Sequence, residues 1–279
     1  MEQHKEIINQ WSESAPYWEK YRTVIREMFA PVTQALIEDA GITNGHTVLD
    51  VAMGPGEPAL SIVDVVGPQG KVVGTDAVTE MVEAAGREGE RRGLHNATFQ
   101  VAFGDSLPFP ANAFDAVVSR FGVMFFPSPI DGVREMLRVL KPGGRFAVAV
   151  WHYAERNPFF SVYSQIVDRY AEPSAPAPDA PDAFRFAAPG KLLTILREAG
   201  ATATSERLLQ FSIRASMPAE DFWTLRSEMS EKLRTKLARL SGAQLADLRR
   251  EVIEAIRAYS SGDEIRFPAE VLVVSGRKN

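Results

Sequence analysis

Two glycines that follow an apolar segment could hold a nucleotide. The segment reads LDVAMGPGEP over residues 49–58, and a helical pattern continues from Glu57 to Val66. Gly54 and Gly56 permit a tight turn and a close approach of the backbone to a ligand. A strand, a glycine-rich turn and a helix form the nucleotide-binding unit of doubly wound folds, in which the ligand lies at the helix N-terminus. The spacing therefore predicts a nucleotide-type site at this turn.

The turn by itself leaves the ligand open. Gly54-x-Gly56-x-x-Ala59 matches the dinucleotide fingerprint, which favours a nicotinamide-dependent (NAD or NADP) oxidoreductase. Glycine-rich turns also occur where no ligand binds. The remainder of the chain has to decide between these interpretations.

Two further carboxylates follow predicted strands. Asp76 ends the strand predicted over 71–75 and lies 20 residues after Gly56, where a carboxylate can accept both ribose hydroxyls of an adenosine ligand. The alternative is a structural role beside the N-terminus of the helix predicted over 79–92. Asp105 follows Gly104 after the strand predicted over 98–103, where it could accept from an adenine amino group. Its alternative role is an Asx-turn.

Four segments, taken in order, resemble the class I S-adenosylmethionine-dependent methyltransferases. They are LDVAMGPGEP, VVGTD, GDSLPFPANAFDAVVSR and EMLRVLKPGGRF, and the resemblance covers residues 45–151. Within that class the chain is most similar to the methyltransferase type 11 branch, which includes the ubiquinone/menaquinone biosynthesis C-methyltransferases. The resemblance implies S-adenosylmethionine as cofactor and S-adenosylhomocysteine as product. The residues that it implies for cofactor binding are Ala52, Met53, Gly54, Gly56, Asp76, Ala77, Met81, Gly104, Asp105, Ser106 and Arg120.

The chain departs from the family pattern at two places. Ala52 stands where the family usually has its first glycine, and we expect a slightly tighter loop with retained binding. The quinone enzymes usually carry an acidic residue and a serine soon after the fifth strand, whereas this chain reads VWHY over residues 150–153. The second departure argues against quinone specificity.

The elements that must position these residues alternate between strand and helix, which predicts a mostly parallel Rossmann-like sheet with helices on both faces. The resemblance implies seven strands, with the seventh antiparallel and inserted between the fifth and sixth. The strands expected from the pattern are 47–51, 71–75, 98–103, 114–119, 145–151, 209–213 and 265–275. A helix with Phe222 through Leu237 on one face, and another around residues 245–256, precede the last strand. We divide one methyltransferase domain, 1–279, into an N-terminal helical lid (1–44), a cofactor core (45–152), substrate-side helices with strand six (153–263) and a terminal strand (264–279).

The same elements suggest an acceptor chamber. The aromatic residues predicted to close it are Trp11, Tyr17, Trp18, Phe121 and Phe160, and they predict a small, aromatic or lipophilic acceptor. The alternative is that these rings only pack the helices onto the sheet. His152, just past strand five, is the candidate general base, and its alternative is a structural histidine. Tyr153 and Arg120 are weaker candidates, for orienting the acceptor.

Composition excludes several classes of protein. The chain of 279 residues has no cysteine, so it has neither disulfides nor thiolate metal sites, and we expect no metal. Its net charge of −5 argues against nucleic acid as partner. No run of about 18 apolar residues predicts a membrane span, and the charged start MEQHKEIINQ gives no expectation of a secretory signal. We expect a cytoplasmic monomer or homodimer. A nucleic-acid or protein methyltransferase, and a cofactor-binding protein without catalysis, remain as alternatives.

Overall fold

The centre of the molecule is one mixed sheet. The computed structural model describes Lys5, residues 8–9, 11–171 and 179–279. Within these residues the sheet has eight strands in the order β3-β2-β1-β4-β5-β8-β6, with β7 paired to β8. The strands are β1 (Thr47–Val51), β2 (Lys71–Asp76), β3 (Ala97–Val101), β4 (Phe114–Arg120), β5 (Leu140–Trp151), β6 (Thr202–Ser216), β7 (Ser260–Ser261) and β8 (Glu264–Arg277). The last long strand is antiparallel to both of its neighbours, β5 and β6, as predicted.

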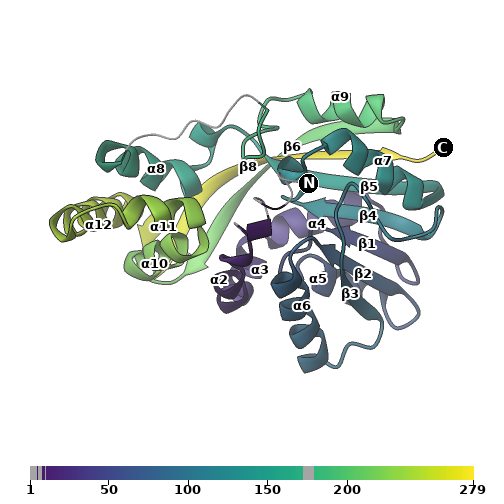
Figure 1. The fold of residues 1–279 in the computed structure, drawn as a ribbon, viewed down its shortest axis with the longest axis horizontal. Helices are drawn as coiled ribbons and strands as arrows, with labels where there is room; N and C mark the ends of the chain where they lie inside the picture. The colour runs from purple at the N-terminus through teal and green to yellow at the C-terminus, as the bar shows by residue number, and fades with distance from the viewer. Residues whose placement is uncertain (1–4, 6–7, 10, 172–178) are drawn as a thin grey trace.

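Helices surround this sheet. They are α2 (Ala15–Lys20), α3 (Arg22–Met28), α4 (Ala30–Asp39), α5 (Ala59–Val66), α6 (Thr79–Arg91), α7 (Pro129–Val139), α8 (Pro158–Tyr170), α9 (Lys191–Glu198), α10 (Ala219–Met229), α11 (Glu231–Leu237) and α12 (Gly242–Arg257). Short 3₁₀ turns are η1 (Val123–Phe125) and η2 (Ala154–Arg156). Figure 1 shows α7 and α9 on one side of the sheet and α4 and α5 on the other. Because both faces are covered, β1 and β4 are buried almost throughout and most of their residues are apolar.

The parallel strands bring their carboxyl ends to one edge. β1 pairs in parallel with β2 and β4, β2 with β3, and β4 with β5. The segments that follow β1, β2, β4 and β5 therefore share this edge, which is where ligands bind in open α/β sheets. The fold thus gathers the predicted site residues from positions far apart in the sequence.

The two antiparallel strands extend further than predicted. β6 and β8 pair from Thr202 with Arg277 to Ser216 with Glu264, so the predicted strands 209–213 and 265–275 are too short. Beyond the parallel strands this ribbon carries α8, α10, α11 and α12, which cluster at one end of the molecule (Figure 1). The alternation of apolar residues is weak in β6 because much of that strand is exposed, and its full length was therefore missed.

Other predicted boundaries also need correction. The helix expected through Leu237 is two helices, because Ser230 is extended and its side chain caps α11 by accepting from Leu233 N at 3.3 Å. The helix after the glycine turn begins at Ala59, with Pro58 as its N-cap. β3 ends at Val101, and β5 already begins at Leu140, where it pairs with Phe114 across a register shift. The two-residue β7 raises the number of strands above the seven expected.

Candidate functional site

The glycine turn is held by backbone geometry and by a neighbouring strand. Ala52, Gly54 and Gly56 have positive φ angles of 60°, 57° and 117°. A Cβ at Gly56 would lie 2.5 Å from Leu60 Cδ1, so this position requires glycine. Ala52 adopts the left-handed conformation that glycine adopts without strain. The expectation of a slightly tighter loop with retained binding at Ala52 stays a prediction.

A buried carboxylate supports the start of the helix after the turn. Asp50 lies in β1 and is fully buried, and its Oδ2 accepts a hydrogen bond of 2.8 Å from Ala59 N. Burial raises the pKa of Asp50 to about 8, against the opposing effects of the Arg120 charge and of the Ala59 bond. A side chain from the preceding strand therefore supplies the partner that Pro58, the N-cap residue, cannot supply.

Asp76 faces the turn from the end of β2. Its Oδ2 accepts from Gly54 N at 2.8 Å and its Oδ1 from Val78 N at 3.0 Å. Desolvation raises the pKa of Asp76 to about 6, although the backbone N–H groups of Val78, Gly54 and Ala77 act in the opposite direction. Each carboxylate oxygen has further acceptor capacity, so these bonds leave room for two ribose hydroxyls. The role of Asp76 in binding ribose stays a prediction.

A third predicted segment reaches the same place after β3. Gly104 packs against Phe126, whose ring would lie 2.3 Å from any Cβ added there. Gly104 and Asp105 both line the cavity described next. Ser106 is exposed and outside the lining, and its N–H donates to Phe103 O at 3.1 Å. The segment therefore offers Asp105 rather than Ser106 to a ligand.

One cavity of about 390 Å³ brings most of the predicted residues together. This volume lies within the usual range of small-molecule sites. The predicted residues that line it are Ala52, Met53, Gly54, Asp76, Ala77, Met81, Gly104, Asp105, Arg120, Trp11, Trp18, Phe121 and Phe160. Gly56, Ser106, Tyr17 and His152 do not line it. Gly56 shapes the turn with its positive φ angle and is not itself in the lining. The ring of Tyr17 lies 5.0 Å from the Arg234 guanidinium instead.

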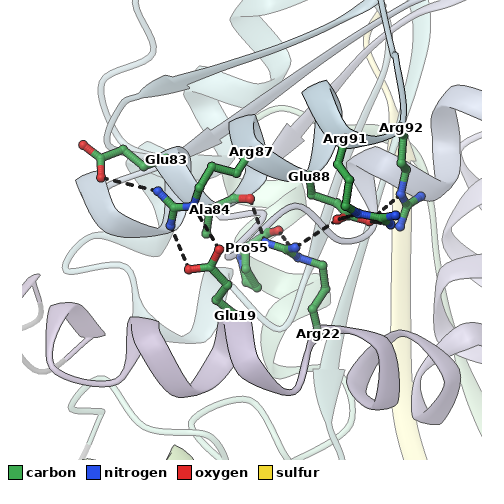
Figure 2. A network of polar contacts seen from close by, with 9 residues as sticks. All are labelled: Glu19, Arg22, Pro55, Glu83, Ala84, Arg87, Glu88, Arg91 and Arg92. Carbon is green, nitrogen blue, oxygen red and sulfur yellow. Dashed lines mark hydrogen bonds and ion pairs between the residues drawn. The ribbon is translucent and has the colours of Figure 1, made fainter.

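The N-terminal helices cover the glycine turn through Arg22, which sequence reasoning missed. Arg22 Nε donates to Pro55 O at 3.0 Å and Nη2 to Ala84 O at 2.6 Å, while Nη1 lies 3.3 Å from Glu88 Oε2 (Figure 2). Glu88 also accepts from Arg91 and Arg92, and these bonds help to lower its pKa to about 2. Arg22 thus attaches α3 both to the turn and to α6.

An aromatic wall stands on the opposite side of the cavity, around the ends of β4 and β5. Phe121 has a φ of 62° and stacks parallel on Trp151 at 4.4 Å between ring centroids. Phe29 meets both rings edge to face, and Phe160 meets Trp151 at 4.9 Å. A bulky residue with positive φ is rare and concentrates at functional sites. Apart from this wall, Trp18 packs against Val78 and Met81 and has a buried Nε1 with no acceptor among the described residues.

Two buried arginines also reach the cavity. Arg120 donates to Thr33 Oγ1 at 2.7 Å and to Glu57 O at 3.4 Å. Burial lowers the pKa of Arg120, and the carboxylates of Glu57 and Asp50 oppose that shift. Arg226, which the sequence analysis did not select, comes from α10. Its signal was present in the pattern, because it stands between Phe222 and Met229 on the apolar face of that helix.

His152 belongs to a polar cluster outside the cavity lining. Its Nδ1 lies 2.7 Å from Glu270 Oε2, and Glu270 also accepts from Gln210 at 3.0 Å. In the same cluster, the side-chain amide of the fully buried Asn157 donates to Glu270 O at 3.1 Å and accepts from Glu270 N at 3.0 Å. These contacts join β5, α8 and β8, and they favour the structural alternative for His152.

Two absences concern only the described residues. In that part of the chain there is no group of three or more histidine, aspartate or glutamate side chains placed to hold a metal ion. Over the same residues, no helix is long and apolar enough to cross a bilayer.

Known proteins share both this fold and its central sequence. The methyltransferase YcgJ of Bacillus subtilis is 36% identical over 139 residues, which are 50% of this chain and 53% of YcgJ. The crystal structure of YcgJ superposes with a TM-score of 0.57 and 23% identity, covering 88% of this chain and 97% of the other, and so supports the fold. The chain spans about half the length of curated relatives such as YcgJ.

Two other relatives match over longer stretches. The ubiquinone/menaquinone biosynthesis C-methyltransferase UbiE of Pseudomonas putida is 34% identical over 196 residues, which are 70% of this chain and 67% of that protein. The nocamycin O-methyltransferase of Saccharothrix syringae is 28% identical over 267 residues, covering 90% and 92% of the two chains. The model of the ubiE/COQ5 methyltransferase family matches residues 30–172. The chain therefore belongs to the ubiE/COQ5 methyltransferase family.

Proposed function

We propose that this protein transfers a methyl group from S-adenosylmethionine to a small, flat, largely apolar acceptor. The observation that carries the proposal is the composition of one cavity. The Asp76 carboxylate and the glycine turn stand on the β1–β2 side, and the Phe121–Trp151 stack stands on the β4–β5 side. A polar nucleoside site and an aromatic acceptor site then share one chamber. Relatives that methylate carbon and relatives that methylate oxygen are both known, so the acceptor atom is left open.

The residues present fit the cofactor. Asp76 is a desolvated carboxylate with acceptor capacity for ribose hydroxyls, and Asp105 lines the wall nearby for the adenine end. The turn at Gly54 brings the backbone close to the ligand, and the buried Trp18 Nε1 is a donor without an acceptor in the described part of the chain. S-adenosylmethionine supplies a methyl group bound to a sulfonium, which already is a good leaving group.

The protein's own contribution is then alignment and exclusion of water. The Phe121–Trp151 stack and Phe29 hold a flat acceptor at a fixed height over the sheet edge. Arg22 fastens the lid over the turn and closes the cavity from the N-terminal side. Well-aligned reactants can obtain roughly 7–11 kcal/mol of the barrier from positioning alone. When the acceptor atom of the substrate is already nucleophilic, the protein does not need a residue that removes a proton from it.

Titration calorimetry tests the proposal. Asp76→Ala removes the ribose acceptor, and charge-assisted hydrogen bonds contribute about 1.5–3 kcal/mol each. We expect affinity for S-adenosylmethionine and S-adenosylhomocysteine to fall at least about tenfold. Asp64→Ala is the matched control, because Asp64 is an exposed aspartate of α5 outside the cavity lining. Unchanged affinity in folded Asp76→Ala, or tighter binding of NAD than of S-adenosylmethionine by the wild type, would contradict the assignment.

A methyl-transfer assay addresses the acceptor. Labelled methyl donor is offered with matched phenols, naphthols, amines and quinols, and methylated product is identified by mass spectrometry. The aromatic wall predicts turnover of flat ring compounds in preference to aliphatic amines. The opposite preference would contradict the acceptor class while leaving the cofactor assignment intact.

A further inference from the structure

Arg226 lies within a cage of aromatic rings in the cavity wall. Its side chain belongs to a residue that is only 7% exposed. The guanidinium carbon lies 4.1 Å from the centre of the Phe159 ring, 5.1 Å from that of Phe160 and 5.4 Å from that of Tyr163. Arg226 Nη2 donates to the Tyr163 hydroxyl at 2.6 Å, whereas Nε is buried and has no acceptor in the described part of the chain.

This buried charge has no anionic partner among the described residues. No carboxylate of those residues lies within ion-pair distance of it, and the Tyr163 hydroxyl is its one hydrogen-bond acceptor there. An arginine has five N–H donors, and charged groups are rarely buried without a partner because desolvation is costly. Arg120 shows the contrast, since it donates to Thr33 and Glu57 and lies near the Asp50 carboxylate. The cation–π contacts compensate Arg226 only in part.

The position of Arg226 assigns it to the acceptor side. It lines the same cavity as Phe160 and Tyr163 of α8, the helix that follows β5. Asp76 lies at the end of β2, on the other side of β1 in the strand order. The guanidinium therefore faces the region of the aromatic wall rather than the ribose site.

We propose that Arg226 binds a carboxylate carried by the acceptor, so that the protein selects flat aromatic acids over neutral analogues. This inference rests on the proposed function and adds the charge of the substrate to it. The planar guanidinium matches a carboxylate in shape and charge. A carboxylate would fill the unused donors, while the rings around Arg226 would hold the flat body of the same molecule.

The test compares two probes of equal shape and different charge. 2-Naphthoate is anionic near neutral pH, whereas 2-naphthamide is neutral. Calorimetric titrations of the wild-type protein with each probe are performed with and without saturating S-adenosylhomocysteine. We expect 2-naphthoate to bind at least about tenfold more tightly. Arg226→Met is expected to remove this preference while changing affinity for 2-naphthamide by less than about threefold. Arg226→Lys is expected to keep part of the preference because it keeps the charge.

A matched control separates the site from net charge. Lys236→Met on α11 removes one positive charge from an ion pair with Asp168, outside the cavity lining, and is expected to keep the full preference. Equal binding of the two probes by the wild type overturns the inference even if Arg226→Met does not fold. It is also overturned if the preference survives in Arg226→Met, or if that variant keeps its thermal stability but loses S-adenosylhomocysteine binding, which would assign Arg226 to the cofactor. If the wild type binds no S-adenosylhomocysteine, the proposed function fails, whereas the probe preference measured without it still tests Arg226.

Discussion

Arg22 Nε donates a hydrogen bond of 3.0 Å to the carbonyl oxygen of Pro55, so helix α3 is attached directly to the turn between Gly54 and Gly56. The same guanidinium reaches Ala84 and Glu88 of α6 (Figure 2). A second contact between the N-terminal helices and α6 joins Arg87 to Glu19 at 2.7 Å on the surface. The N-terminal helices therefore have a part-buried attachment to the turn, through Arg22, and an exposed attachment to α6, through Glu19.

These two attachments predict different effects on cofactor release. Arg22→Met removes hydrogen bonds from a charged, half-buried group to backbone carbonyls, each worth about 1.5–3 kcal/mol. We expect S-adenosylhomocysteine to dissociate at least about tenfold faster, measured by stopped-flow displacement with excess S-adenosylmethionine. Arg87→Met, the matched control, loses exposed ion pairs worth about 0–1 kcal/mol, and its dissociation rate should change less than about fivefold. Equal rates in the two variants would show that the contact with Pro55 does not hold the lid.

The residues predicted from the sequence and those missed differ in where their signals lie. Gly54 and Asp76 belong to local motifs in which a strand, a turn and a helix follow one another, and Asp105 follows the end of strand β3. Parallel pairing then brings these strand ends together, and so the prediction required only the order of elements. Arg22 and Arg226 reach the cavity from α3 and α10. The local sequence of those helices does not indicate which strand ends they cover. The sequence did contain a signal for Arg226, because a charged residue at an apolar position of an amphipathic helix is unusual and often has a function.

The extent of the long antiparallel ribbon was hidden for a different reason. Toward the ends of β6, exposed residues alternate with half-buried or buried ones, and few of them are large and apolar. The sequence there shows little of the apolar alternation that predicts a strand. The strand conformation of these residues depends on pairing with β8, whose partner residues are 75 positions away at Thr202 and 48 positions away at Ser216. The predicted long helix ends at Met229, where the local cap formed by the Ser230 hydroxyl starts the next helix.

His152 gives a prediction that separates catalysis from structure. The pair formed by His152 Nδ1 and Glu270 Oε2 is partly buried and joins the end of β5 to β8. His152→Ala should lower the free energy of unfolding by about 1.5–3 kcal/mol, measured by chemical denaturation. Its methyl-transfer rate at saturating substrates should stay within about twofold of wild type, because a general base would contribute about 10²–10⁴-fold.

The control for His152 is the partner residue. Glu270→Ala and the double variant complete a thermodynamic cycle, and the two single losses should not add, since both remove the same contact. A large fall in turnover for His152→Ala without loss of stability would restore the general-base hypothesis.

Asp76 predicts how cofactor affinity depends on pH. Desolvation raises the pKa of Asp76 to about 6, from the ordinary aspartate value of 3.8. Between these two pH values the unliganded folded protein therefore holds a proton that the unfolded chain has released. Stability from this group is therefore lost as the pH rises from about 4 to about 6. Ribose hydroxyls donate better to the ionised carboxylate. Affinity for S-adenosylmethionine should thus increase as the pH rises through about 6, by at most about tenfold per pH unit, and level off above about 7.

The variant Asp76→Asn isolates this titration. It keeps a carbonyl acceptor without an ionisable proton, so its affinity should be lower at neutral pH and should not change through the window around pH 6. Burial raises the pKa of Asp50 to about 8, so Asp50 titrates at higher pH than Asp76. Any effect of Asp50 on affinity should therefore be the same in the wild type and in Asp76→Asn. Calorimetric titrations at a series of pH values, with buffers of different ionisation enthalpy, also report the proton released by the wild type on binding. If wild-type affinity is flat through pH 6, or if Asp76→Asn shows the same rise, the ribose contact does not depend on the charge of Asp76.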